Sequence, residues 1–275
     1  MQQILHYINY AGFTPIVQGV NHVAAGGVVQ LSAINPAEFS LSVEQGATAE
    51  VVLLHGSEEH STISIELAEG AVLRLTQLLV GNGEVNLAVN HAQGANSDIV
   101  AVSLKANKTI YNLQLSGADG YSHVNTLQAG SSKDNNSVTL NMRHESADCS
   151  SRSLSKCVAS AEASLHFDGL VYVAQDAQRT VAEQNCRSIM LSDTAHIEAR
   201  PQLEIYADDV KCSHGATMGQ VDTDAILYMR QRGLSEAQAR RVQIEGFVTD
   251  LLDRVTIEEL RESLRKVVIA KLEEM

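Results

Sequence analysis

The sequence is poor in aromatic residues and in proline. It contains no Trp, four Phe, seven Tyr and only three Pro in 275 residues, while 44% of its residues are hydrophobic. A core must therefore be built mainly from Val, Leu, Ile and Ala, which favours thin, repetitive layers over a globule filled with large rings. So few prolines in a chain with this apolar content also argue against disorder, and we expect the chain to be folded throughout.

Basic residues and long apolar runs are scarce as well. The 20 Lys and Arg are outnumbered by 33 Asp and Glu, which gives a net charge of −13. Nucleic acid is not an expected partner, because phosphate recognition needs clustered cations. No apolar run approaches the ~20 residues that span a bilayer, and the first fifteen residues carry no Lys or Arg. We therefore expect a cytoplasmic protein with no membrane partner.

The cysteines are few and far apart. Cys149, Cys157, Cys186 and Cys212 form no C-x-x-C pair, a spacing that fits neither a dense disulfide framework nor a self-contained zinc site. Reduced thiols are expected. A phosphate-binding loop of the G-x-x-x-x-G-K-[ST] type is also missing, so we expect that this chain binds no ATP.

A repeat of about two dozen residues is present in the first half of the chain. Gly-Ala pairs begin at Gly46, Gly70, Gly94 and Gly117, and short alternating segments between them are typical of half-buried strands. Strands at this spacing fit a sandwich, a barrel or a β-helix, and the repeat favours a parallel β-helix with a narrow aliphatic interior. The alternative is that the four pairs arise by chance. We predict a mainly β fold with a β-helix core over residues 1–219.

After Gly219 the apolar spacing becomes helical. The pattern predicts one helix over residues 222–232 that ends at Gly233, and two more that begin at the capping boxes of Ser235 and Thr256. Residues 220–275 are therefore a short C-terminal helical segment. Two roles are open: a cap that covers the last coil of the β-helix, or a docking surface for a partner.

The densest group of chemically versatile residues lies between the strands and the helices, over residues 201–219. This stretch, with the segment 227–234 that follows, closely resembles the signature of the SufB/SufD family of iron-sulfur cluster assembly proteins, and looks most like its SufD-type members. The resemblance continues upstream through residues 167–173, 176–180 and 184–185, and in looser form to 43–49.

This resemblance implies a right-handed parallel β-helix that pairs with a second SufB- or SufD-type chain, as a homodimer or a heterodimer. It further implies a SufC-type ABC ATPase on the C-terminal helices, sulfur from a cysteine desulfurase, a transient iron-sulfur cluster as cargo and a flavin as a possible cofactor. The chain is then a non-catalytic scaffold subunit. Longer members carry a helical N-terminal segment, whereas this chain enters strand-like sequence early, so we expect a short form that lacks it.

Two candidate iron ligands stand in the signature, Cys212 and His214. Thiolate sulfur suits iron and imidazole can replace it. At strand spacing i and i+2 both side chains project from one face, opposite Lys211 and Ser213. Taken alone, Cys212 would be a small buried residue and His214 a turn residue, but the resemblance favours ligands, with His214 better supported.

Cys186 is the third candidate iron ligand. In SufB-type chains the matching segment carries a cysteine that receives sulfur or binds the nascent cluster, and Arg187 would lower the thiol pKa if both side chains lay close on one face. Cys149 and Cys157 have no such match and are expected to be incidental.

Three other features are expected to be structural. His55 and His60 flank a polar turn and should be solvated. His144 fits a hydrogen-bonding role better than a sulfur or iron route. Asp208 and Asp209 point to opposite faces of a strand and cannot act as an acid/base pair.

Two other functions compete with the cluster scaffold. A carbohydrate-active β-helix enzyme would show a row of charges at the repeat period and a secretion signal, and the sequence shows neither. A structural dimer platform would hold the ATPases without binding the cluster. It predicts that replacing Cys186, Cys212 and His214 leaves assembly activity intact.

Overall fold

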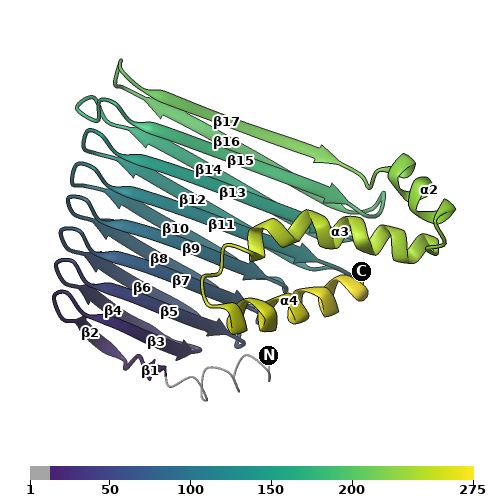
Figure 1. Ribbon diagram of the computed structural model, residues 1–275, viewed down its shortest axis with the longest axis horizontal. Helices are drawn as coiled ribbons and strands as arrows, with labels where there is room; N and C mark the ends of the chain where they lie inside the picture. The colour runs from purple at the N-terminus through teal and green to yellow at the C-terminus, as the bar shows by residue number, and fades with distance from the viewer. Residues whose placement is uncertain (1–12) are drawn as a thin grey trace.

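The computed structural model describes residues 13–275, in which strands alternate between two parallel sheets that stack into a solenoid (Figure 1). The first sheet contains β1 (Thr14–Pro15), β3 (Val28–Ile34), β5 (Thr48–His55), β7 (Val72–Leu79), β9 (Asn96–Ser103), β11 (Tyr121–Gly130), β13 (Ser150–Ala159), β15 (Val181–Met190) and β17 (Lys211–Gly219). The second sheet contains β2 (Gly19–Val23), β4 (Glu38–Val43), β6 (His60–Leu67), β8 (Glu84–His91), β10 (Lys108–Leu115), β12 (Asn135–His144), β14 (Ser164–Val173) and β16 (His196–Ile205). Each strand pairs in parallel with the strand two places along, so the predicted parallel β-helix is confirmed.

The interior of the β-helix is narrow and largely aliphatic. In β6, for example, Ile63, Ile65 and Leu67 are buried while the residues between them face outward. Inward-facing residues of the two sheets, together with the small Ala47, Ala71 and Ala95, form one continuous buried cluster. A thin layer of this kind has no room for many rings, which explains the shortage of aromatic residues.

The turn that begins each coil depends on one residue in the left-handed region. Gly46, Gly70 and Gly94 hold this place with φ angles of 65°, 66° and 65°. In the next coil the residue is Asp119, with φ 59°, and not Gly117, so the fourth Gly-Ala pair of the sequence repeat is not equivalent to the first three. The coils also lengthen here, since the strands grow from eight residues in β9 and β10 to ten in β11 and β12.

Gly117 is instead required by a close approach between coils. A Cβ atom at this position would lie 2.1 Å from the backbone nitrogen of Gln93. We expect Gly117→Ala to destabilise the fold by about 2 kcal/mol or more, because the backbone must shift. Gly94→Ala is the control, because a Cβ there would meet only the Gly70 nitrogen, at an ordinary contact distance of 4.0 Å. Its cost of about 1 kcal/mol comes from the left-handed φ. Equal losses in denaturant unfolding would contradict this assignment.

Three helices follow the last strand: α2 (Thr223–Gln231), α3 (Glu236–Leu252) and α4 (Glu258–Glu273). Asp222 caps α2, and Ser235 with Gln238 forms the capping box predicted for α3. The capping box predicted at Thr256 is wrong. The N-cap of α4 is Ile257, which makes no side-chain capping bond, and Glu258 and Glu259 in the first turn favour this end through the helix dipole instead.

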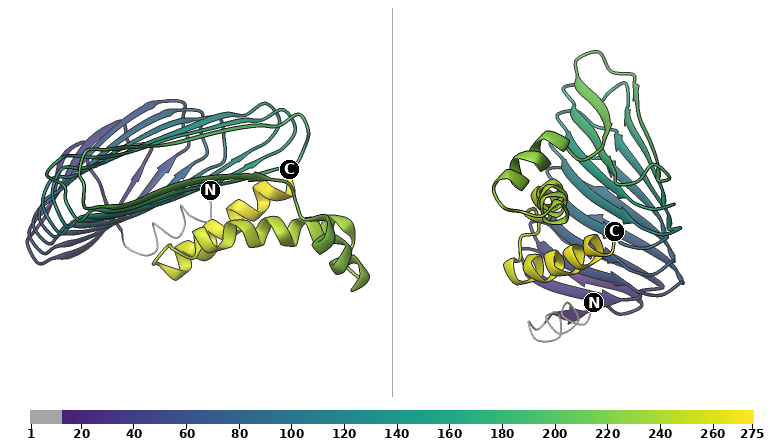
Figure 2. Two further views of the ribbon diagram at one scale, coloured as in Figure 1. Left: turned by 90° about the horizontal axis from the view of Figure 1, so that it is seen from above. Right: turned by 90° about the vertical axis from the view of Figure 1, so that its right-hand side faces the viewer.

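The helical segment does not cover the end of the solenoid. Helices α3 and α4 lie across the outer face of the sheet formed by the odd-numbered strands (Figure 2). A second apolar cluster fills this contact, built from Val52, Leu54, Leu78, Val100, Val102, Leu127, Ala129 and Val158 on the sheet and from Ile244, Val248, Leu251, Leu252, Leu260, Leu264 and Val268 on and near the helices. The cap that sequence alone left open is therefore wrong for α3 and α4, since both helices pack against a sheet face.

Two ammonium groups fix the helices to the solenoid. The Lys156 side chain of β13 donates to the Asp250 carboxylate and to the Phe247 carbonyl on α3. Lys271 of α4 donates to Ser131 at 2.7 Å and to Asp134 at 3.2 Å, in the turn before β12. The sequence also predicts that no helical segment precedes the β-helix. This prediction concerns residues before β1, which are outside the described residues.

Candidate functional site

The end of the solenoid at β16 and β17 is uncovered. In the part of the chain that the structure describes, β17 pairs only with β15 and β16 only with β14, so each leaves one edge free. Met218 of β17 lies beside the inward-facing Ser188 but is 56% exposed. Likewise, Ile205 of β16 lies beside the inward-facing Val173 but is 38% exposed. Free strand edges beside exposed apolar side chains are suited to pairing with another chain.

Cys212 and His214 lie on β17 at this open end. In register they stand over Ala182 and Gln184 of β15, both buried inside the solenoid, so the two candidates share the inward side of the last strand. Cys212 is half-buried and packs against the interior cluster, whereas His214 is exposed. Partial burial raises the pKa of the Cys212 thiol, and a backbone hydrogen bond involving Ala182 offsets part of this rise. Metal binding at this thiol must therefore displace a proton.

Cys186 lies one strand deeper and is almost fully buried. Strand alternation sends Arg187 to the opposite, exposed face, so the predicted effect of Arg187 on the thiol is wrong. A hydrogen bond with Cys157 lowers the pKa of Cys186 instead, against the effect of burial. The same bond, together with complete burial, raises the pKa of Cys157.

Cys157 is the residue that sequence reasoning missed. It lies on β13 beside Ser188, offset by two residues from Cys186 on the neighbouring strand β15, and accepts a 3.6 Å hydrogen bond from the Gln128 amide. No local motif marks it, and only the 31-residue register between β13 and β15 brings the two thiols together. Cys149, by contrast, donates to the Gly117 carbonyl at 3.2 Å, a bond that suits a structural role.

The interior becomes polar towards the open end. One inward-facing position is occupied, from β5 to β17, by Val51, Leu75, Ile99, Val124, Ser153, Gln184 and His214. Neither polar atom of the Gln184 amide has a hydrogen-bond partner, and the same is true of the Ser153 hydroxyl. A buried polar group without a partner costs about 1–3 kcal/mol unless water or a bound group supplies the hydrogen bond. These two stand directly beneath His214.

The family model for "SUF system FeS cluster assembly, SufBD core domain" matches residues 30–247, well over half of the chain. This chain belongs to the SufBD core family. The match runs from β3 into α3 and so includes the open end, the thiol pair and part of the helical segment.

Relatives named SufD place the chain close to SufD within this family. The iron-sulfur cluster assembly protein SufD of Escherichia coli is 34% identical over 151 residues, which cover 55% of this chain and 36% of that protein. SufD of Bacillus subtilis is 30% identical over 158 residues, covering 58% and 36%. A SufBD family protein of Synechocystis is 35% identical over 183 residues, covering 64% and 40%. The matches thus span less than half the length of these relatives.

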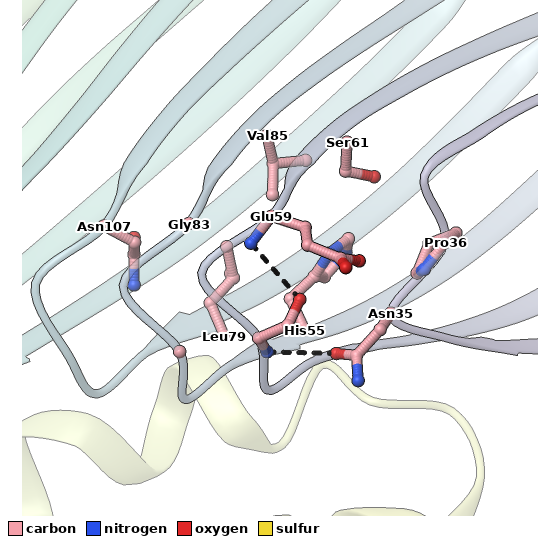
Figure 3. A pocket seen from close by; sticks show the side chains of 11 residues that line it. Asn35, Pro36, His55, Glu59, Ser61, Leu79, Gly83, Val85 and Asn107 are labelled. Carbon is pink, nitrogen blue, oxygen red and sulfur yellow. Dashed lines mark hydrogen bonds between the residues drawn. The ribbon is translucent and has the colours of Figure 1, made fainter.

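In this SufBD core domain, four histidines are buried rather than solvated: His55, His91, His123 and His144. His55, predicted to be exposed, accepts from Gln77, which in turn accepts from Tyr111. A cavity of about 10 Å³ beside His55, roughly the space of one water, is lined by Asn35, Glu59 and their neighbours (Figure 3). His60 is exposed, as expected.

His91 and His144 lie deeper in the interior. His91 donates to the Gln114 carbonyl and contacts Ser97 at 2.8 Å, and His144 contacts Ser151 at 2.8 Å. The hydrogen-bonding role predicted for His144 is consistent with this contact. Burial lowers the pKa of His55, of His91 and of His144 to about 4 in each case.

Asp209 supports the turn ahead of β17 through its backbone. Its carbonyl accepts from the Arg179 amide and its amide donates to the Gln178 side chain.

Among residues 13–275, no group of three or more His, Cys, Asp or Glu side chains is arranged to hold a metal ion. Over the same range, no helix combines the length and the apolar character needed to cross a membrane.

The residues around a pocket of about 440 Å³ between α3, α4 and Leu191 do not fit a flavin. No aromatic side chain lines it. Two arginines there could bind a phosphate, but both already form ion pairs. Arg240 is paired with Glu236, and Arg241 with Glu245 and Glu273. The flavin remains a prediction from resemblance alone.

Proposed function

We propose that this chain is a scaffold subunit of a SUF-type iron-sulfur cluster assembly complex. It pairs through the open end of its β-helix with a second SufB- or SufD-type chain, and the nascent cluster forms there as cargo. The observation that carries this proposal is the placement of Cys212 and His214 on the inward side of β17, whose outer edge is free.

The number of ligands supports a shared site. An iron-sulfur cluster is held by four protein ligands, usually thiolates with imidazole as a replacement. Cys212 and His214 supply two from the edge of this chain, and a second chain paired at β17 would bring further donors to the same edge. Cys186 lies one strand below, beneath Ala216. In this proposal it receives sulfur that originates from a cysteine desulfurase.

Energy for assembly comes, in this proposal, from a SufC-type ABC ATPase that docks on the helical segment. Leu227 and Tyr228 of α2 are 53% and 56% exposed, and they lie where the helical segment leaves β17. A docked ATPase would therefore contact the element that connects directly to the strand of Cys212 and His214. Nucleotide binding can shift this strand only through contacts that differ between the two states.

Docking on α2 is tested by co-purification. Removing the helices altogether would expose the apolar face of the odd-numbered sheet and cause aggregation, so a surface variant is the better test. We expect Leu227→Asp with Tyr228→Ser to reduce the co-purifying ATPase to about a tenth or less, since exposed apolar anchors carry most of the binding energy.

The matched control is Val28→Asp. Val28 is 74% exposed on β3, at the other end of the solenoid, and its replacement should leave ATPase recovery unchanged. Equal recovery with wild type and the α2 variant would show that the ATPase docks elsewhere or not at all.

A further inference from the structure

Lys156 is a buried cation whose partners all belong to one helix. Its side chain extends from the outer face of β13 under α3, and the residue is only 2% exposed. The ammonium donates to the Asp250 carboxylate and to the Phe247 carbonyl, and lies 4.7 Å from the centre of the Phe247 ring. The compensation of this charge therefore depends on the position of α3.

The next residue along β13 belongs to the interior. Because side chains alternate across a strand, Lys156 points outward to α3 while Cys157 points into the interior that also holds Cys186 of the neighbouring strand. A single peptide unit thus connects the helix anchor to the thiol pair. The surroundings are tightly packed, since Cys157 is fully buried and Cys186 is 1% exposed.

We propose that Lys156 is a positioning residue that couples the placement of α3 to the reactivity of the Cys157–Cys186 pair. A buried ammonium cannot lose its partners and stay where it is, because an uncompensated charge is not tolerated in an apolar contact. When α3 moves, Lys156 must follow it or become hydrated. Either change displaces β13, and a close-packed interior transmits that displacement to the thiols.

The second anchor of the helical segment provides a built-in comparison. Lys271 ties α4 to Ser131 and Asp134, in the turn between β11 and β12, and no cysteine is next to either partner. Loosening this contact frees a helix from the sheet without pulling on β13. The proposal therefore predicts that the two anchors differ in their effect on the thiols, although both are ion pairs between helix and solenoid.

The test is the alkylation rate of each cysteine in the full chain, measured with iodoacetamide at one fixed pH and read by peptide mass spectrometry. In Lys156→Met we expect Cys157 and Cys186 to react at least about tenfold faster than in wild type, because local opening governs access to buried groups. Cys149, buried in the same solenoid but bonded to Gly117, should stay within about twofold. Lys156→Arg keeps the charge and the donors and should restore slow alkylation.

Three results would overturn the proposal: unchanged rates at Cys157 and Cys186, an equal increase at Cys149, or an equal increase in Lys271→Met. Asp250→Asn provides a milder second variant, because this side chain is 55% exposed and its replacement removes the carboxylate without creating a cavity. It should accelerate the same two thiols and no others. The experiment uses no iron, sulfide or ATPase, so its outcome is independent of the proposed scaffold function.

Discussion

Replacement of Cys212 by Ser together with His214 by Ala is expected to abolish cluster loading, to below about a tenth of wild type, because β17 then has neither a thiolate nor an imidazole to bind iron. The measurement is iron content and visible absorbance of the anaerobically reconstituted complex. Both side chains lie at the open end, Cys212 only half-buried and His214 exposed, so the fold should survive the change.

Cys149→Ser is the control for this experiment. Cys149 is a buried thiol of the same solenoid, but it lies away from β17 and its role is the hydrogen bond to Gly117. Its loss should leave cluster loading unchanged. Unchanged iron content in the Cys212/His214 variant would refute the ligand assignment and would favour the alternative, a structural platform that holds the ATPases while its partner binds the cluster.

The second large effect is acid destabilisation by three of the buried histidines, His55, His91 and His144. Their folded pKa of about 4 lies below the unfolded value of 6.5, so the unfolded state binds more protons between these limits. The contribution of these histidines to the free energy of unfolding is therefore full above about pH 6.5 and is lost as the pH falls towards 4. Each histidine contributes about 2 kcal/mol of this loss by pH 5, where carboxylates are still largely ionised, so His55, His91 and His144 together contribute about 6 kcal/mol.

Denaturant unfolding at pH 8 and at pH 5 measures this effect. His91→Gln should reduce the difference between the two pH values by about 2 kcal/mol, since the neutral side chain no longer takes up a proton on unfolding. His60→Gln makes the same replacement at an exposed position and serves as its control. A pH dependence in His91→Gln as large as that of wild type would show that His91 does not contribute to acid destabilisation.

The sequence predicted the architecture because its signals are local. Alternation of apolar and polar residues follows from the strand period, and the shortage of rings follows from a thin interior. The capping box of Ser235 and Gln238 is equally local, since both bonds lie within one turn. The same reasoning failed at Thr256, where the chain starts its helix one residue later without a side-chain cap.

The sequence by itself determined the strands, the change to helices after Gly219 and the pair Cys212 and His214 at strand spacing, because each depends on residues within a few positions. The parallel β-helix was predicted from a longer signal, the repeat of about two dozen residues. Only the tertiary structure decided three further points. The register between β13 and β15 brought Cys157 within two residues of Cys186, burial enclosed His55, and packing placed α3 and α4 on a sheet face, which left the end at β17 open. These features depend on residues far apart in the chain, and no local pattern encodes such contacts.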